Sequence, residues 1–345
     1  MPTIKLIPKG GINPEVINPL HFYRALAISY GIINDDIIRI DDKQFVLSSL
    51  NITDSADGSL VVANTVFVSK NGNDLTGLVE RMDKPFLTIA AARTALLAFY
   101  IGGNAPSATN RILIKVFNGY YNEPIILDNY VDIDLSASVA TCTSSQLIKD
   151  NGVAVDSIIY GSAKLYGVTM GGGNAIQATA NSNIRIYCDT IIGRTATTNG
   201  IVTINTRKID GDGDFVLQAL GGIVTINAYE LTTNTNVIKN DSGTTVINAT
   251  LISSPSNAPV TITGGSLTIN AARIVTAGVN KNAVEKTGGT LILNNATMIA
   301  TGTGKSIFAP APQNVKIYGA CQGNLAVDAN ITQQVGIVKI DANVI

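Results

Sequence analysis

The sequence repeats itself roughly every 22 residues, and this periodicity constrains the fold more than any other feature. Segments such as NIRIYCDTII (183–192), IVTINTRKID (201–210) and IVTINAYELT (223–232) share one frame. The anchor of the frame, the residue after an apolar strand position, falls at Tyr166, Tyr187, Asn205, Asn227, Asn248, Asn270, Asn295 and Tyr318. Such a period is typical of a solenoid, in which each unit contacts only its neighbours.

Two apolar stripes accompany the anchors. One position before them stand Leu165, Ile186, Ile204, Ile226, Ile247, Ile269, Asn294 and Ile317, and four positions after them stand Met170, Ile191, Ile209, Leu231, Ile252, Ile274, Ile299 and Gln322. Apolar and polar residues alternate here as in a strand with one buried face. Because one coil cannot bury its stripe alone, the pattern predicts stacked coils that share parallel backbone hydrogen bonds and one core.

The anchor asparagines are interpreted as a turn device. Asn tolerates left-handed backbone geometry at a corner, and its amide can bond the Asn one coil away. Opposite charges also fall at equivalent positions of successive coils, Asp189 with Arg207 and Lys208 with Glu230, which predicts pairs that keep the register. A leucine-rich repeat is excluded because the LxxLxL consensus is absent and linkers such as TAGVNKNAVEKTGG (276–289) are too short and polar for a helix.

Charge and composition narrow the class of protein. Lys and Arg number 24 against 25 Asp and Glu, so the net charge of -1 indicates no nucleic-acid partner. No apolar run approaches a membrane span and the N-terminus MPTIKLIPKGG does not look like a signal peptide, so we expect neither membrane insertion nor export. Cys142, Cys188 and Cys321 are scattered, which favours buried free thiols.

The segment from Thr65 to Phe117 breaks the repeat and is expected to cap the stack. It reads as a strand TVFVSK, a polar loop, a helix from about Thr88 to Tyr100 and a second strand, ILIKVFNGYYNEPIIL. Solenoid ends expose unpaired strand edges, so a helix at this place would cover the open end.

The motifs VFVSKNGND, KPFLTIAAARTAL and ILIKVFNGYYNEPI resemble the opening of the pectate-lyase-like superfamily of right-handed parallel β-helix proteins, over about 60 residues. The resemblance implies an all-β, right-handed parallel β-helix solenoid with an N-terminal capping helix and a small non-repeating N-terminal module. The superfamily includes polysaccharide lyases, glycoside hydrolases, adhesins and bacteriophage tailspikes and fibres, so the fold alone does not settle function.

Four parts of the chain are expected. Residues 1–64 form an attachment or oligomerisation module, with a short helix at 19–33 and strands after it; 65–110 form the cap, 111–320 the β-helix, and 321–345 a C-terminal cap or subunit contact. A non-repeating module before a β-helix resembles the particle-attachment domain of phage tailspikes.

Candidate chemistry on the coils is sparse. Asp132 and Asp134 alternate on one strand and could form a carboxylate pair, although solvent-exposed acids are the commoner meaning. Asp210, Asp212 and Asp214 resemble the start of a calcium loop, but the sixth position is Phe215, which favours a solvated turn. The tyrosines of the early coils, which could stack on sugars, are Tyr120, Tyr121, Tyr130, Tyr160, Tyr166 and Tyr187.

We therefore assign no catalytic, cofactor-binding or metal-binding residue. His21 is the only histidine and lies in the N-terminal module, so no histidine relay fits the coils. The expected function is a structural subunit of the bacteriophage virion, such as a fibre, spike or appendage, attached through residues 1–64 and able to bind a host-surface glycan. The resemblance implies a homotrimer. The alternative is a polysaccharide-degrading tailspike, a hydrolase or lyase; a cellular adhesin is disfavoured by the missing signal peptide.

Overall fold

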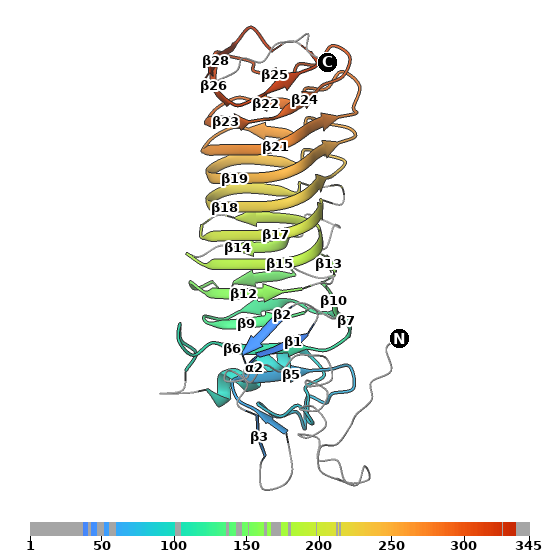
Figure 1. Cartoon of the computed structure of the whole chain (residues 1–345), viewed down its shortest axis with the longest axis vertical. Coiled ribbons are helices and arrows are strands. Elements are labelled where there is room, and N and C mark those ends of the chain that lie inside the picture. The colour runs from blue at the N-terminus through green and yellow to red at the C-terminus, as the bar shows by residue number, and fades with distance from the viewer. Residues whose placement is uncertain are drawn as a thin grey trace.

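The chain folds into a right-handed parallel β-helix of about nine turns. The computed structural model describes residues 37–40, 43–46, 52–54, 60–100, 105–135, 138–142, 147–150, 152–161, 164–166, 174–178, 181–197, 199–211, 213, 215–325 and 327–335. Figure 1 shows the coils stacked along the long axis, with α2 near one end of the stack and β28 at the other. The expected fold class is therefore confirmed.

Three parallel ladders run along the stack and give each coil three faces. Five long strands bend around corners and serve more than one face: β15 (Asn183–Ile192), β17 (Ile201–Asp210), β18 (Leu217–Thr232), β19 (Ile238–Ser254) and β21 (Ser266–Thr276). Parallel strands of this kind need both neighbours for their hydrogen bonds, which is why the coils support one another.

We call the first ladder the anchor face, because it carries the anchor column. Besides the central parts of the long strands it contains β5 (Thr65–Val68), β6 (Ile112–Val116), β9 (Val131–Asp134), β12 (Asp156–Tyr160), β23 (Thr290–Asn294), β26 (Gln313–Tyr318) and β28 (Ile331–Val335). The sequence frame ends at Tyr318, but β28 pairs in register with β26 and adds one more rung.

The other two ladders are built from shorter strands. The second face contains β7 (Gly119–Asn122), β10 (Ser138–Thr141), β13 (Lys164–Tyr166), β24 (Thr297–Ile299) and β27 (Gln322–Gly323). The third face contains β8 (Ile125–Leu127), β11 (Ile148–Asp150), β14 (Asn174–Ala178), β16 (Arg194–Thr197), β20 (Val260–Ile262), β22 (Val284–Lys286) and β25 (Ile307–Phe308).

The core is a continuous stack of like side chains inside the coils. Ile204, Ile226, Ile247 and Ile269 are paired one above another and fully buried. Each such side chain contributes about 1.5–3 kcal/mol by leaving water. The alternation of the strand Ile201–Asp210 therefore places one face of every coil in a shared core, as predicted.

The predicted frame is wrong in two coils. Tyr187 pairs with Tyr160, not Tyr166, which lies on the second face opposite Ile192. Asn270 pairs with Asn294, not Asn295. The linkers between strands differ in length and absorb the difference at corners, so counting a fixed period shifts the frame. In the later coil the buried stripes therefore run through Leu293 and Met298.

The predicted ladder of asparagine side chains is present, and a separate column of glycines turns another corner of the coils. Asn227 donates to Asn205 at 2.8 Å and Asn248 to Asn227 at 2.7 Å, and the ladder continues through Asn270 (2.6 Å) to Asn294 (2.5 Å). The predicted left-handed backbone is wrong for Asn205, Asn227, Asn248 and Asn270, which lie within strands, and is confirmed for Asn295, which has φ +54°. A column of glycines with positive φ turns the corner that precedes the anchor face: Gly200, Gly222, Gly243, Gly265 and Gly289.

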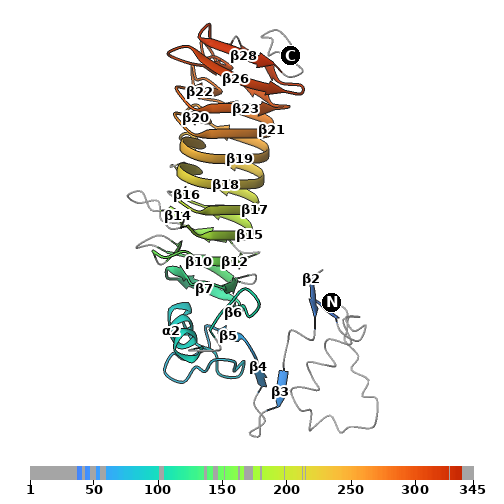
Figure 2. The same ribbon diagram turned by 90° about the vertical axis from the view of Figure 1, so that its left-hand side faces the viewer.

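The capping helix α2 (Ile89–Phe99) covers the first coils, as Figure 2 shows. The Thr88 hydroxyl accepts the Ala91 amide, and the Glu123 carboxylate accepts the amides of Ile89 and Ala90. These contacts satisfy the free amides of the helix start and place a negative charge at its positive end. The apolar side of α2 is buried against the core. The predicted helix from about Thr88 to Tyr100 is confirmed.

The N-terminal region contributes two small antiparallel pairs, β1 (Ile37–Ile40) with β2 (Lys43–Val46) and β3 (Ile52–Asp54) with β4 (Leu60–Val62). The predicted helix at 19–33 and His21 lie outside the described residues, as do the last ten residues of the C-terminal segment. The domain boundaries stay predictions. No helix in the described part of the chain is long and apolar enough to cross a membrane.

Candidate functional site

The outward side of the anchor face, over β6, β9, β12 and β15, carries a group of charged side chains and two exposed tyrosines. Side chains alternate in these strands, so Ile159 and Ile186 point into the core while Tyr160 and Tyr187 face outward. Because the strands are parallel and in register, outward positions of successive coils lie above one another. This patch is the candidate site.

An ion-pair network crosses four successive coils of the patch. Arg111 binds the Asp132 carboxylate with two nitrogens, at 2.5 and 2.7 Å, and its third nitrogen lies 3.0 Å from Asp156. Asp156 also accepts a hydrogen bond from Arg185 at 2.5 Å and one from Asn183 at 3.0 Å. Bidentate guanidinium–carboxylate pairs of this kind fix both groups in place. The network therefore connects strands that lie up to three coils apart.

The neighbouring carboxylate, Asp134, is paired separately. Its partner is Lys115, directly opposite in the previous coil, with Nζ 2.5 Å from Oδ2. Asp132 and Asp134 are only 8% and 9% exposed, so the favoured sequence interpretation, solvent-exposed acids, is wrong for both. Each carboxylate is buried because a basic residue of another coil, Arg111 or Lys115, neutralises it.

The surroundings of Asp156 and Tyr160 shift the pKa of both groups away from neutral pH. Burial by itself would raise the pKa of the Asp156 carboxyl, but the hydrogen bonds from Arg111 and Asn183 and the charge of Arg185 keep it below its ordinary value. Burial, together with the nearby Asp132 charge, raises the pKa of Tyr160. The patch thus presents an ionised carboxylate beside a neutral phenol.

Tyr160 and Tyr187 form an aromatic platform beside this network. Their rings stack at 5.8 Å between centroids and 16° between planes, and they are 36% and 42% exposed. Asn205 follows Tyr187 in the same column and begins the asparagine ladder. Exposed ring faces with hydrogen-bonding groups on both sides suit a sugar, which has apolar C–H faces and polar edges.

The other predicted tyrosines do not join the platform. Tyr121 is fully buried, with the Lys70 ammonium 3.9 Å from its ring centre, and Tyr120 is exposed on the second face. Tyr130 lies beside Arg111, whose guanidinium is 5.6 Å from the ring centre. The side chain of Tyr166 lies outside the described part of the structure.

The structure also shows where the predicted acidic loop at Asp210 and the predicted charge pairs of the later coils lie. Asp210 lies 3.7 Å from Lys208, whereas Asp212 and Asp214 lie outside the described residues. The predicted pairs are confirmed: Arg207 bonds Asp189 at 2.9 Å, and Lys208 lies 3.6 Å from Glu230. They are exposed or half-buried and keep register.

The three cysteines, Cys142, Cys188 and Cys321, are buried and free, as predicted. Burial raises the pKa of the Cys188 thiol to about 12, so the thiol stays protonated. Among the described residues no group of three or more His, Cys, Asp or Glu side chains is arranged to hold a metal ion. The Arg111–Asp156–Arg185 network was missed because its members belong to different coils, and only the correct register brings them together.

No protein-family model, curated protein or solved structure matches the chain.

Proposed function

We propose that the chain is a structural subunit of a bacteriophage particle, a fibre, spike or other appendage whose β-helical body binds a glycan of the host surface. Attachment to the particle is assigned to residues 1–64 and the exposed rod to the β-helix. The chain would act as an oligomer, with a trimer expected from the sequence resemblance.

The observation that carries this proposal is the pairing of the acids on the coil surface. Among the described residues of the coils, the acids with a Lys or Arg partner within 4 Å are Asp128, Asp132, Asp134, Asp156, Asp189, Asp210, Glu230 and Asp241. Glycoside hydrolysis requires one carboxyl that stays protonated and one that is free to attack or to activate water. Carboxylates held by guanidinium and ammonium groups serve rigidity and recognition instead.

The aromatic platform supports the binding part of the proposal. Tyr160 and Tyr187 are fixed by stacking on each other, and Arg185 and Asp156 beside them are fixed by the ion-pair network. A ligand therefore meets side chains that lose little conformational freedom on binding, which favours affinity. The polysaccharide-degrading alternative would use the same face, where Asp132 and Asp156 lie near the platform.

The test is peptide mass fingerprinting of purified phage particles from the culture in which the coding sequence occurs, with light scattering of the purified chain. A discrete oligomer that is also a stoichiometric constituent of the particle is the expected result. A monomer that is absent from particles would overturn the proposal. Release of reducing ends from host polysaccharide by the pure chain would favour the depolymerase.

A further inference from the structure

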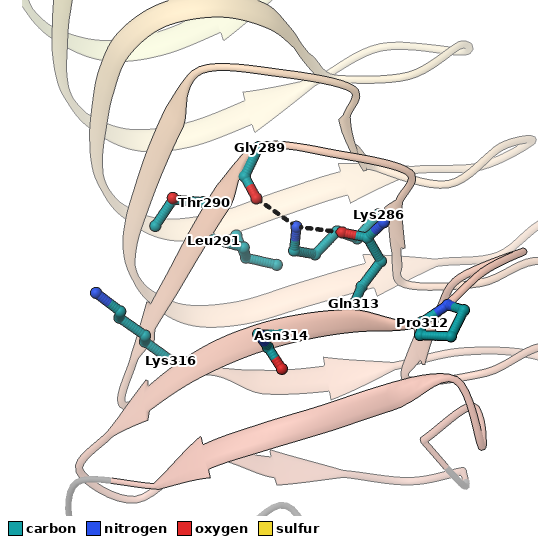
Figure 3. A pocket seen from close by; sticks show the side chains of 8 residues that line it. All are labelled: Lys286, Gly289, Thr290, Leu291, Pro312, Gln313, Asn314 and Lys316. Atoms are coloured by element: carbon teal, nitrogen blue, oxygen red, sulfur yellow. Dashed lines mark hydrogen bonds between the residues drawn. The ribbon is translucent and has the colours of Figure 1, made fainter.

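A polar hollow lies near the C-terminal end of the rod, on the corner between the third face and the anchor face. It has a volume of about 300 Å³, and its lining includes Lys286 of β22, Thr290 of β23, and Gln313, Asn314 and Lys316 of β26. Figure 3 shows the Lys286 ammonium turned toward Gly289 and Gln313, with Lys316 and Asn314 extending from the neighbouring strand. The hollow is thus formed by two successive coils.

Lys286 is unusual because its side chain enters the coil interior and is only 1% exposed. Its Nζ donates to the carbonyl oxygens of Gly288 (2.8 Å) and Gly289 (2.5 Å) and to Gln313 Oε1 (3.0 Å). All three acceptors are uncharged, and no ion pair of the described residues includes Lys286. The three hydrogen bonds occupy the three N–H groups but leave the buried charge without a counter-ion, so a nearby anion would stabilise it.

The corner itself does not need a positive charge. In the ladder of the third face, Lys286 lies opposite Ile262, and Ile262 lies opposite Asn240. Asn240 caps its own corner with a neutral amide, which donates to the Gly264 carbonyl at 2.7 Å and accepts the Thr245 hydroxyl at 2.6 Å. A neutral amide thus satisfies the corner carbonyl two coils earlier. The fold therefore does not require the positive charge of Lys286 at the equivalent position.

A second cation stands at the rim of the hollow. Lys316 is exposed, and its side chain makes no hydrogen bond or ion pair with the described part of the chain. The exposed Asn314 and Thr290 add an amide and a hydroxyl beside it. Two ammonium groups with neutral donors around a hollow, and no carboxylate in its lining, form an anion-attracting surface.

We propose that this hollow binds the anionic group, a carboxylate or a phosphate, of an acidic polysaccharide. Lys286 supplies charge at the floor, and Lys316 supplies an exposed donor at the rim. The site lies at the opposite end of the stack from α2 and the N-terminal strands (Figure 1), where a rod attached by its N-terminus would meet a cell surface. That biological setting rests on the proposed function, whereas the anion site does not.

The test is isothermal titration calorimetry of the full chain at low salt with trigalacturonate, with neutral maltotriose as the matched ligand and inorganic phosphate as a competitor. We expect trigalacturonate to bind and maltotriose not to bind, and added salt to weaken binding because it screens charge. Competition by phosphate would assign the site to phosphate groups as well as carboxylates, and its absence would restrict the site to carboxylates.

Lys316→Gln should weaken trigalacturonate binding by about two- to fivefold, since it removes one exposed charge. Lys305→Gln, which changes a lysine outside the hollow, should leave binding unchanged. Lys286→Met should abolish trigalacturonate binding, and circular dichroism will show whether this variant folds. If Lys286→Met does not fold, the binding of Lys316→Gln tests the site. Equal effects of Lys316→Gln and Lys305→Gln, or loss of binding in Tyr160→Ala, would overturn the hollow as the site. Particle membership, measured separately, is unaffected by that outcome.

Discussion

The glycines with positive φ that precede the anchor face should be needed for the stability of the stacked coils. The substitution Gly243→Ala tests this requirement. Gly243 has φ +75°, and a Cβ built there would lie 2.5 Å from the Gly222 carbonyl oxygen and 2.7 Å from the Gly221 carbonyl carbon. The left-handed backbone costs an alanine about 1 kcal/mol, and forcing an atom into a packed backbone costs about 1–3 kcal/mol more. We therefore expect the free energy of unfolding to fall by about 2–4 kcal/mol.

Gly213→Ala is the matched control, because Gly213 has a similar angle, φ +86°, but no atom lies within 4 Å of the added Cβ. This variant should lose only the conformational part, about 1 kcal/mol. Both free energies of unfolding can be measured by urea titration with circular dichroism as the signal. If the two substitutions destabilise the chain equally, the close approach of coils at this corner is refuted.

Three further predictions follow from the coil contacts. Asn248→Ala removes two ladder bonds and should cost about 1–2 kcal/mol in a urea titration, whereas Asn294→Ala, which removes one, should cost about half as much; equal losses would contradict a ladder of amide bonds. The pKa of Asp156 in the folded chain is below its ordinary value of 3.8, so the ionised carboxylate stabilises the fold above pH 3.8. This stabilisation is lost as the pH falls through the folded pKa. The urea midpoint should therefore drop between about pH 5 and pH 2, and it should drop less steeply in Asp156→Asn. Tyr187→Ala should weaken retention of the chain on immobilised host polysaccharide, and Tyr229→Ala, at another exposed tyrosine, should not; equal retention of the two variants would remove the platform from the proposed function.

The regular coils were predictable from the sequence because their chemistry repeats. Between Val202 and Ile269 every inward position of the anchor face falls where the period places it, since strands with one buried face must alternate. The asparagine ladder follows from the same register. The capping helix was also predictable, because alanine-rich helical periodicity follows the Thr88 cap.

The errors arose where the chain leaves the regular spacing. Tyr160, not Tyr166, belongs to the anchor column because the linker before Asn183 is long, and linker length is set by corners rather than by core periodicity. The glycine column was visible only as Gly-rich linkers, since a positive φ at Gly243 depends on the carbonyl one coil away. The burial of Asp132 was hidden for the same reason: its partner Arg111 is 21 residues earlier.

Lys286 illustrates the limit of pattern reading for sites. In the sequence it sits in a polar linker, NAVEKTGG, and looks solvated. Strand pairing with Ile262 turns it into the core, and only the three acceptors around its ammonium show how the charge is held. Functional candidates in a solenoid therefore emerge from the column they occupy more than from their neighbours in sequence.

The central claim, that this rod is an appendage of a phage particle, is tested most directly by immunogold electron microscopy. Antibodies raised against the purified chain would be applied to intact particles from the culture that carries the coding sequence. We expect gold on thin projections of the particle, at a constant site on each. Particles that carry no label, although the antibody binds the free chain in the same lysate, would contradict the account.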